Sequence, residues 1–235
     1  MNARVDDAAP DVALYGHWIC PFATRVEFAL HQRGIAHELI DLPPSAVRGP
    51  DFVLPNEFVK HSPRLEIPLV RVGSDYLADS IPVLEWLEER VVAPALLSSD
   101  GAARALVRER MGWIDRHAFR PMIGVYYGTD PATIGQASEA LGSALAEMGQ
   151  WTAETGWLAG DAPSLAEAVA MPIHIRMAGL QRLGFTGKLT TGWRAHGDRC
   201  RTLAGWPGVE WSAEQTDEFV GRFQAFRCKR QSRDG

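Results

Sequence analysis

The chain has 235 residues, of which 46% are hydrophobic and 23% are charged, and its formal net charge at pH 7 is −5. This length allows one large or two small domains with a real hydrophobic core. The negative charge argues against nucleic acid and anionic membranes as partners, because both need a basic surface. No window approaches the roughly 18 apolar residues of a membrane span, and the N-terminus lacks the apolar run of a signal peptide.

The three cysteines, Cys20, Cys200 and Cys228, are far apart and show neither a disulfide framework nor zinc-site spacing. Free thiols fit a reducing cytoplasm, which is the location that we predict. Lysine and arginine gather in residues 222–235, which we interpret as a solvated, frayed tail.

The first 42 residues predict a strand, a helix and a second strand. The short apolar segment 11–16 is typical of a strand. Residues 21–33 repeat apolar side chains at helical spacing, with proline in the first turn and Gly34 as the stop. The side chains of residues 35–42 alternate between two faces, as those of a strand do. This order implies two parallel strands joined by a crossover helix.

Residues 43–63 hold five prolines and a glycine, which predicts a long irregular segment with one short helix at 56–60. Two strands, 67–72 and 75–78, flank a Gly-Ser turn and predict a hairpin. Residues 79–91 predict a helix with Ser80 as the N-cap.

The pattern changes after a segment, 92–100, with the composition of a linker. Beyond it only helical patterns occur, and Ser164 with Glu167 predicts a capping box. The predicted helices are 101–127, 133–154, 164–181, 190–204 and 212–226. We therefore expect an α/β domain over 1–91, a linker over 92–100 and an all-helical domain over 101–235.

Four segments together resemble the cytosolic glutathione S-transferase family, and cover nearly the whole chain in the right order. They are CPFATRVEFALHQRGI from Cys20, SPRLEIPLV from Ser62, DSIPVLEWLEE from Asp79 and WLAGDAPSLAEAVAMP from Trp157. The first is similar to the omega-class and dehydroascorbate-reductase signature. The resemblance implies a thioredoxin-like domain (βαβ–ββα) followed by an all-α domain, a homodimer, and glutathione as the co-substrate.

Two departures from the family bear on the site. Leu65 stands where the family usually has a glycine before the cis-proline, and Ser62 stands where it has asparagine, so the turn and the shape of the glutathione site are in question. Ala23 occupies the place of the second cysteine of a CxxC motif. Any redox chemistry would therefore use a single thiol.

Cys20 is the candidate catalytic residue. A helix N-terminus offers unpaired amides and a partial positive charge, which lower the pKa of a cysteine and favour the reactive thiolate. The alternative is an inert buried cysteine, which is common for this residue type. The resemblance favours a working thiolate. A metal site of His17 with Cys20 is not expected, because no other ligand pair has suitable spacing.

The resemblance also implies the residues that bind glutathione. The Ile67 backbone, before a cis bond to Pro68, would pair with its cysteinyl part, while Ser80 and the Asp79 carboxylate would hold its γ-glutamyl end. A cation would hold the glycyl carboxylate, and Lys60 is our choice over Arg48 and Arg64. The predicted binding residues are Phe22, through its amide at the helix N-terminus, Lys60, Ile67, Pro68, Asp79 and Ser80. The alternatives are an ordinary proline at a strand start and a plain N-cap.

The second substrate would lie between the domains, and the candidates for it are Trp113, His117 and Tyr127. Their spacing does not put all three on one helix face, and most aromatic residues of this segment are ordinary core or interface residues. His174 is expected to be a satisfied core histidine, and no metal site is predicted.

The leading hypothesis is a glutathione-dependent thiol transferase or reductase of omega-like type, in which Cys20 attacks a mixed disulfide. One alternative is conjugation, dehalogenation or isomerisation on the thiolate of glutathione itself, without a covalent cysteine. Another is a transferase-like binding or regulatory module. The sequence does not name the second substrate, nor does it separate glutathione from another small thiol.

Overall fold

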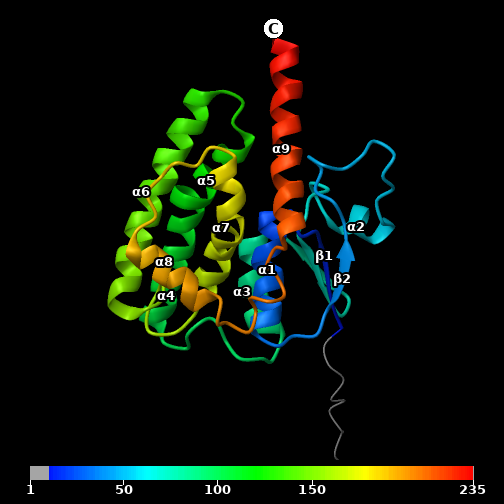
Figure 1. The fold of residues 1–235 in the computed structure, drawn as a ribbon. Coiled ribbons are helices and arrows are strands. Elements are labelled where there is room, and N and C mark those ends of the chain that lie inside the picture. Colours follow the sequence, from blue (N-terminus) through cyan, green and yellow to red (C-terminus); the bar gives the residue numbers. More distant parts are fainter. Residues whose placement is uncertain (1–10, 235) are drawn as a thin grey trace, which may run out of the picture. The chain divides into compact units, whose positions relative to one another are not determined.

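The computed structural model describes residues 11–234, which divide into two compact units (Figure 1). The first unit ends at Pro94 and the second begins at Ala95, within the segment that the sequence predicts as a linker. None of the helices in this described range is long and apolar enough to cross a membrane.

A four-stranded mixed sheet in the order β2-β1-β3-β4 forms the centre of the first unit. The central strand β1 pairs in parallel with β2 and antiparallel with β3, and β3 pairs antiparallel with β4. The strands are β1 (Val12–Gly16), β2 (Glu38–Asp41), β3 (Leu69–Val72) and β4 (Asp75–Ala78). The predicted parallel pair and hairpin are confirmed.

The second strand is shorter than the predicted 35–42, because its first residues complete the end of the preceding helix. Gly34 has a φ of 66°, and the Ile35 amide donates to the Leu30 carbonyl at 2.9 Å. A left-handed glycine followed by such a bond is a common way to end a helix.

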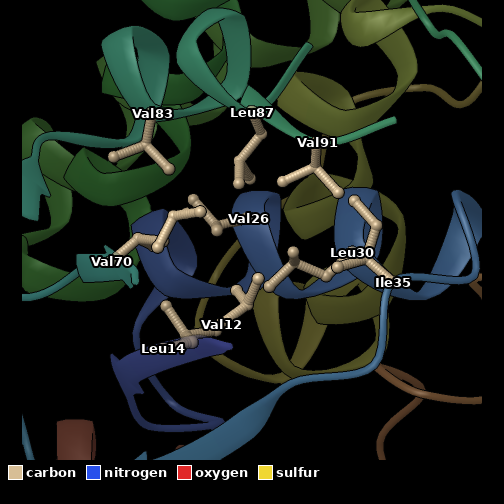
Figure 2. Close-up of a cluster of buried hydrophobic side chains, with 10 residues drawn as sticks. Val12, Leu14, Val26, Leu30, Ile35, Val70, Val83, Leu87 and Val91 are labelled. Carbon is tan, nitrogen blue, oxygen red and sulfur yellow. The ribbon is translucent and has the colours of Figure 1, made fainter. Parts of the chain in front are cut away.

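Three helices cover the sheet: α1 (Pro21–Gln32), α2 (Asn56–His61) and α3 (Ser80–Arg90). Figure 2 shows the cluster on one face, where side chains of α1 lie between those of α3 and those of β1. Its buried members are Val12, Leu14, Val26, Leu30, Ile35, Val70, Val72, Val83, Leu87 and Val91.

The other face of the sheet carries a second cluster, because successive strand residues point to opposite sides. Tyr15 follows Leu14 on β1 and packs against Phe58 of α2, with ring centroids 5.8 Å apart. Cys20 and Ile67 belong to this cluster as well. Two residues of the predicted site, Cys20 and Ile67, therefore meet on the α2 side of the sheet.

The second unit is helical throughout its described elements (Figure 1). They are α4 (Gly101–Ile114), the π-helix η1 (Asp115–Phe119), α5 (Arg120–Tyr127), α6 (Pro131–Thr155), α7 (Leu165–Arg182), α8 (Thr191–Cys200) and α9 (Ala213–Asp234). Extensive contacts join α5 to α6, α6 to α8, α4 to α7, and α7 to α9. The predicted 101–127 helix is thus interrupted by a π-helical turn, and the predicted 190–204 helix ends at Cys200.

The capping box is present at the start of α7. The Ser164 hydroxyl accepts from the Ala166 amide at 3.2 Å, and Glu167 accepts from the Ser164 amide at 2.7 Å. The reciprocal bonds satisfy amide groups that a helix N-terminus otherwise leaves unpaired.

The prediction of a frayed C-terminal tail is wrong for the backbone, because α9 continues to Asp234. Its buried residues Phe219 and Phe223 pack on Tyr126, and Arg227 donates to the carbonyl groups of Val125 and Leu183. These long-range contacts stabilise a helix whose residues 228–230 are exposed. The local sequence alone, with its cluster of positive charges, favoured a frayed tail.

Candidate functional site

Cys20 is the N-cap of α1, with Pro21 as the first helical residue. Its amide donates to the His17 carbonyl at 2.9 Å, and its carbonyl accepts from the Thr24 amide and hydroxyl, each at 3.0 Å. These bonds fix the residue at the helix start. The thiol therefore stands where helix amides and the helix dipole favour a negative charge.

The Cys20 thiol is 4% exposed, and its sulfur lies 3.8 Å from the carbonyl oxygen of Ile67. Tyr15, Phe58 and Leu69 complete the apolar surroundings. The structure thus brings together two predicted site residues that are 47 positions apart in the chain.

The Ile67–Pro68 peptide bond is cis, as the family resemblance implies. Immediately before it, Leu65 has a φ of 53°, in the left-handed region that favours glycine. The Leu65 amide donates to the Ser62 carbonyl at 3.1 Å. The leucine therefore adopts the backbone that the expected glycine would take, and the departure leaves the turn in place.

Ser62 closes this turn, a role that sequence reasoning did not identify. Its hydroxyl donates to the Glu66 carbonyl at 3.0 Å and accepts from the Glu66 amide at 3.2 Å, and its side chain is buried. A serine hydroxyl can bond to nearby backbone groups in this way. The presence of serine where the family has asparagine is the sequence feature that could have predicted this role.

Asp79, rather than Ser80, is the N-cap of α3, which corrects the sequence prediction. Asp79 has a φ of 74°, and its side chain makes no capping bond to the helix. Ser80 is the first helical residue and is buried. Its hydroxyl instead accepts from Arg25 Nη1 at 3.3 Å, so the serine side chain binds to α1.

Arg25 is 1% exposed and lies in the interior between α1 and α3, whereas the sequence suggested that it points along its own helix. A buried guanidinium beside the N-terminus of α3 adds positive charge where the helix dipole is also positive. This end of α3 is consequently suited to an anionic group.

The three candidate cations near the cis-proline differ in their partners. Arg48 donates to the carbonyl groups of Pro43 and Leu65, and Arg64 pairs with the Asp79 carboxylate. Within residues 11–234, Lys60 of α2 is exposed and makes no hydrogen bond or ion pair. Lys60 is therefore the available cation of the three.

Phe22 lies in the first turn of α1 and is 37% exposed, with the Arg25 guanidinium 5.4 Å from its ring centroid. Its ring is thus a partly exposed neighbour of Arg25, and its amide is in the first turn that Cys20 caps.

The predicted substrate residues fall into two groups. Trp113 of α4 and the exposed His117 of η1 have ring centroids 4.9 Å apart, and Trp113 also contacts Trp151 at 4.7 Å. Tyr127 belongs to a different aromatic cluster, in which it packs on Phe223 of α9 at 5.0 Å. The π-helical turn shifts the register between the two groups.

The chain resembles known proteins over both units. The sequence profile described as "Glutathione S-transferase, N-terminal domain" matches residues 19–90. The maleylacetoacetate isomerase of Pseudomonas aeruginosa is 28% identical over 68% of this chain and 78% of that protein. Two other curated relatives match over only 43% and 58% of their own length.

Solved structures of low sequence identity share the fold. Rice GST1, solved in complex with glutathione, aligns with a TM-score of 0.78 at 15% identity, over 94% of this chain and 98% of that one. Glutathione transferase Omega 3C from Trametes versicolor aligns with a TM-score of 0.77 at 17% identity, over 93% and 92%. Residues 19–90 thus match the model of the glutathione S-transferase N-terminal domain family, and the chain shares the fold of solved glutathione transferases.

Proposed function

We propose that the protein is a glutathione-dependent transferase in which Cys20 exchanges thiols with a disulfide substrate. The observation that carries the proposal is the position of the Cys20 sulfur, at the N-terminus of α1 and 3.8 Å from the Ile67 carbonyl. The same carbonyl belongs to the residue before the cis-proline. A thiol and a strand-like backbone edge at one place suit a ligand that is itself a cysteine-containing peptide.

Each end of glutathione has a partner in this arrangement. The γ-glutamyl carboxylate fits the N-terminus of α3, where Ser80 lies with Arg25 behind it. The glutathione ammonium group fits the Asp79 carboxylate, in exchange for Arg64. Lys60 is the cation for the glycyl carboxylate. The solved complex of rice GST1 with glutathione supports this choice of ligand.

The reaction consists of two thiol–disulfide exchanges. The Cys20 thiolate attacks the glutathione sulfur of a mixed disulfide, which forms a Cys20–glutathione disulfide and releases the other thiol as a thiolate that takes up a proton. A glutathione thiolate then attacks the glutathione sulfur of this intermediate. Oxidised glutathione leaves, and the Cys20 thiolate is regenerated. One protein thiol suffices, in agreement with Ala23 at the second position of the motif.

The second candidate is isomerisation, in which the glutathione thiolate reacts with the substrate and Cys20 only hydrogen-bonds to it. Two observations favour it: the Cys20 thiol is only 4% exposed, and the 28% identical relative is named maleylacetoacetate isomerase. In this case the substrate candidates are the predicted residues Trp113, His117 and Tyr127, of which His117 would meet an acidic group. Both candidate functions include the homodimer and the cytoplasmic location that we predict from the sequence.

The test is glutathione-dependent reduction of a small glutathione mixed disulfide, coupled to reduction of the oxidised glutathione formed. We expect turnover by the wild type, a loss of at least about 100-fold in Cys20→Ser, and no change in Cys228→Ser, because Cys228 is exposed on α9. Retained disulfide reduction in Cys20→Ser would overturn the proposal.

Isothermal titration with glutathione and an isomerisation assay on maleylacetoacetate separate the remaining outcomes. Isomerisation by both wild type and Cys20→Ser supports the second candidate. No binding of glutathione to the wild type would overturn both.

A further inference from the structure

A buried group of three metal-ligating side chains lies in the second unit, on the neighbouring helices α7 and α8 (Figure 1). His174 comes from α7, whereas His196 and Cys200 are four residues apart on one face of α8. His196 and Cys200 are completely buried, and His174 is partly buried. We name this group the His–His–Cys cluster.

The distances within the cluster fit a common metal ion. His174 Nε2 lies 3.0 Å from His196 Nδ1, and Cys200 Sγ lies 3.9 Å from the same nitrogen. One ligand atom from each residue lies within 4.8 Å of the others. A tetrahedral zinc site, with bonds of about 2.0–2.1 Å to nitrogen and about 2.3 Å to sulfur, requires ligand atoms about 3.3–3.6 Å apart. The two distances of 3.0 and 3.9 Å lie within about 0.3–0.4 Å of this requirement. The remaining pair, His174 and Cys200, is at most 4.8 Å apart and would close by up to about 1.2 Å on binding.

We propose that the His–His–Cys cluster binds one transition-metal ion of the zinc class, through His174 Nε2, His196 Nδ1 and the Cys200 thiolate. Imidazole nitrogen and thiolate are the ligands that such ions prefer over the oxygen ligands of magnesium and calcium. This site is in the second unit and is independent of the proposed glutathione chemistry.

The surroundings of His196 support this assignment. The other ring nitrogen of His196, Nε2, lies 3.5 Å from the buried Glu167 carboxylate. Glu167 also accepts hydrogen bonds from the Leu158 amide, the Ser164 amide and the Ser164 hydroxyl. A carboxylate that holds the far nitrogen of a histidine orients it and raises its basicity toward a metal.

The charges around the proposed metal ion also balance. A divalent ion would meet one negative charge on the Cys200 thiolate and one on Glu167. Arg201 stands nearby and would repel a cation, but it is paired with Asp198 at 2.8 Å. Because thiolate is the ligand form, binding is expected to release a proton.

His174 is held in place by two neighbours. Its ring stacks on Trp193, with centroids 3.8 Å apart and planes 10° from parallel. A Cβ on Gly197 would stand 3.0 Å from His174 Nδ1, so a side chain there would crowd the ring. The lack of a side chain at Gly197 lets α8 approach the imidazole closely.

A cavity adjoins the cluster on the side of His174. His174, Gly197 and Asp198 help to line a cavity of about 260 Å³. A zinc-class ion with three protein ligands completes its coordination with water, and this cavity is the side from which water would enter.

The experiment uses the full chain with Cys20→Ser and Cys228→Ser, so that Cys200 is the only thiol. This metal-free protein is titrated with Co²⁺, which gives a thiolate-to-cobalt absorption band, and Zn²⁺ is then added as competitor. We expect one equivalent of Co²⁺ with the band, and displacement by Zn²⁺. Adding Cys200→Ser should abolish the band, and adding His174→Gln should weaken binding at least about 10-fold.

His117→Gln in the same background is the matched control, since this histidine is exposed in the same unit, and it should bind as the background does. If Cys200→Ser fails to fold by circular dichroism, His174→Gln decides, because this residue is only partly buried. No stoichiometric Co²⁺ band in the background protein would overturn the proposal. Equal Co²⁺ affinity with and without His174→Gln would do so as well, and would leave the cluster as a hydrogen-bond network.

Discussion

At Leu65 the backbone takes a conformation that leucine rarely adopts. A φ of 53° costs a residue with a Cβ about 1–2 kcal/mol, and glycine avoids this cost. The strain is tolerated because Ser62 bonds to both the amide and the carbonyl of Glu66 and so fixes the turn.

Leu65→Gly is therefore expected to raise the free energy of unfolding by about 0.5–1 kcal/mol, after allowance for the greater freedom of glycine in the unfolded chain. The leucine side chain is 38% exposed, so its removal loses little apolar burial. Urea unfolding measures the change, with Leu65→Ala as the control that keeps the strain. Equal stability of the two variants would contradict this account of the turn.

Glu27 of α1 is a second residue with a measurable signature. Burial raises the pKa of its carboxyl from 4.5 to about 7. A carboxyl whose pKa is higher in the folded state favours folding while it is protonated. Its contribution is complete below pH 4.5 and is lost as the pH rises through about 7.

Glu27→Gln should remove this pH dependence. The shift corresponds to about 3 kcal/mol, which we reduce to about 1–2 kcal/mol because the side chain is not fully buried. The difference in unfolding free energy between variant and wild type is expected to grow by that amount from pH 4.5 to pH 8. Glu89→Gln, an exposed position on α3, is the control. A constant difference across this pH range would show that Glu27 titrates normally.

At the scale of elements, the caps determine where helices begin. Among the described N-caps whose side chain bonds to the helix, the cap of α7 differs in its burial, because Ser164 is 6% exposed and Glu167 is fully buried. Asp100 caps α4 in the usual way, accepting from the Ala103 amide at 2.8 Å, but at an exposed position. If the capping side chain is removed, water can replace its hydrogen bond at the exposed Asp100 but not at the buried Ser164.

Ser164→Ala is consequently expected to destabilise the protein by about 2 kcal/mol, and Asp100→Ala by about 1 kcal/mol or less. Thermal or urea unfolding of the two variants side by side measures this. A cost at Asp100 that equals the cost at Ser164 would mean that burial of the cap is irrelevant.

At the scale of the whole molecule, the prediction concerns the formation of a homodimer. Several apolar side chains of the first unit are exposed near the sheet edge and the segment after it, among them Leu39, Phe52 and Val53 at 44%, 39% and 86%. Large apolar side chains that gather on a surface are typical of interaction surfaces. They agree with the homodimer that the family resemblance implies.

Analytical ultracentrifugation is expected to give twice the chain mass of 25.9 kDa. Val53→Asp should shift the equilibrium toward monomer, because a charge would be placed in a desolvated interface. Val92→Asp, at a valine that is also exposed but follows α3 in the chain, should not. A wild type that sediments as a monomer at micromolar concentration would refute the prediction.

The sequence by itself determined most of the elements and the order of the two units. The strand–helix–strand pattern, the hairpin, the capping box at Ser164 and the position of Cys20 at a helix start all follow from local preferences. These features depend on neighbours within a few residues, so they can be read along the chain.

Only the tertiary structure decided which distant side chains meet. Arg25 reaches Ser80 across 55 positions, and His174 reaches His196 across 22. The last helix extends to Asp234 because Phe219, Phe223 and Arg227 bind to other helices, against the local charge pattern. Such contacts arise from packing between elements, whose free energy is not encoded in any short segment.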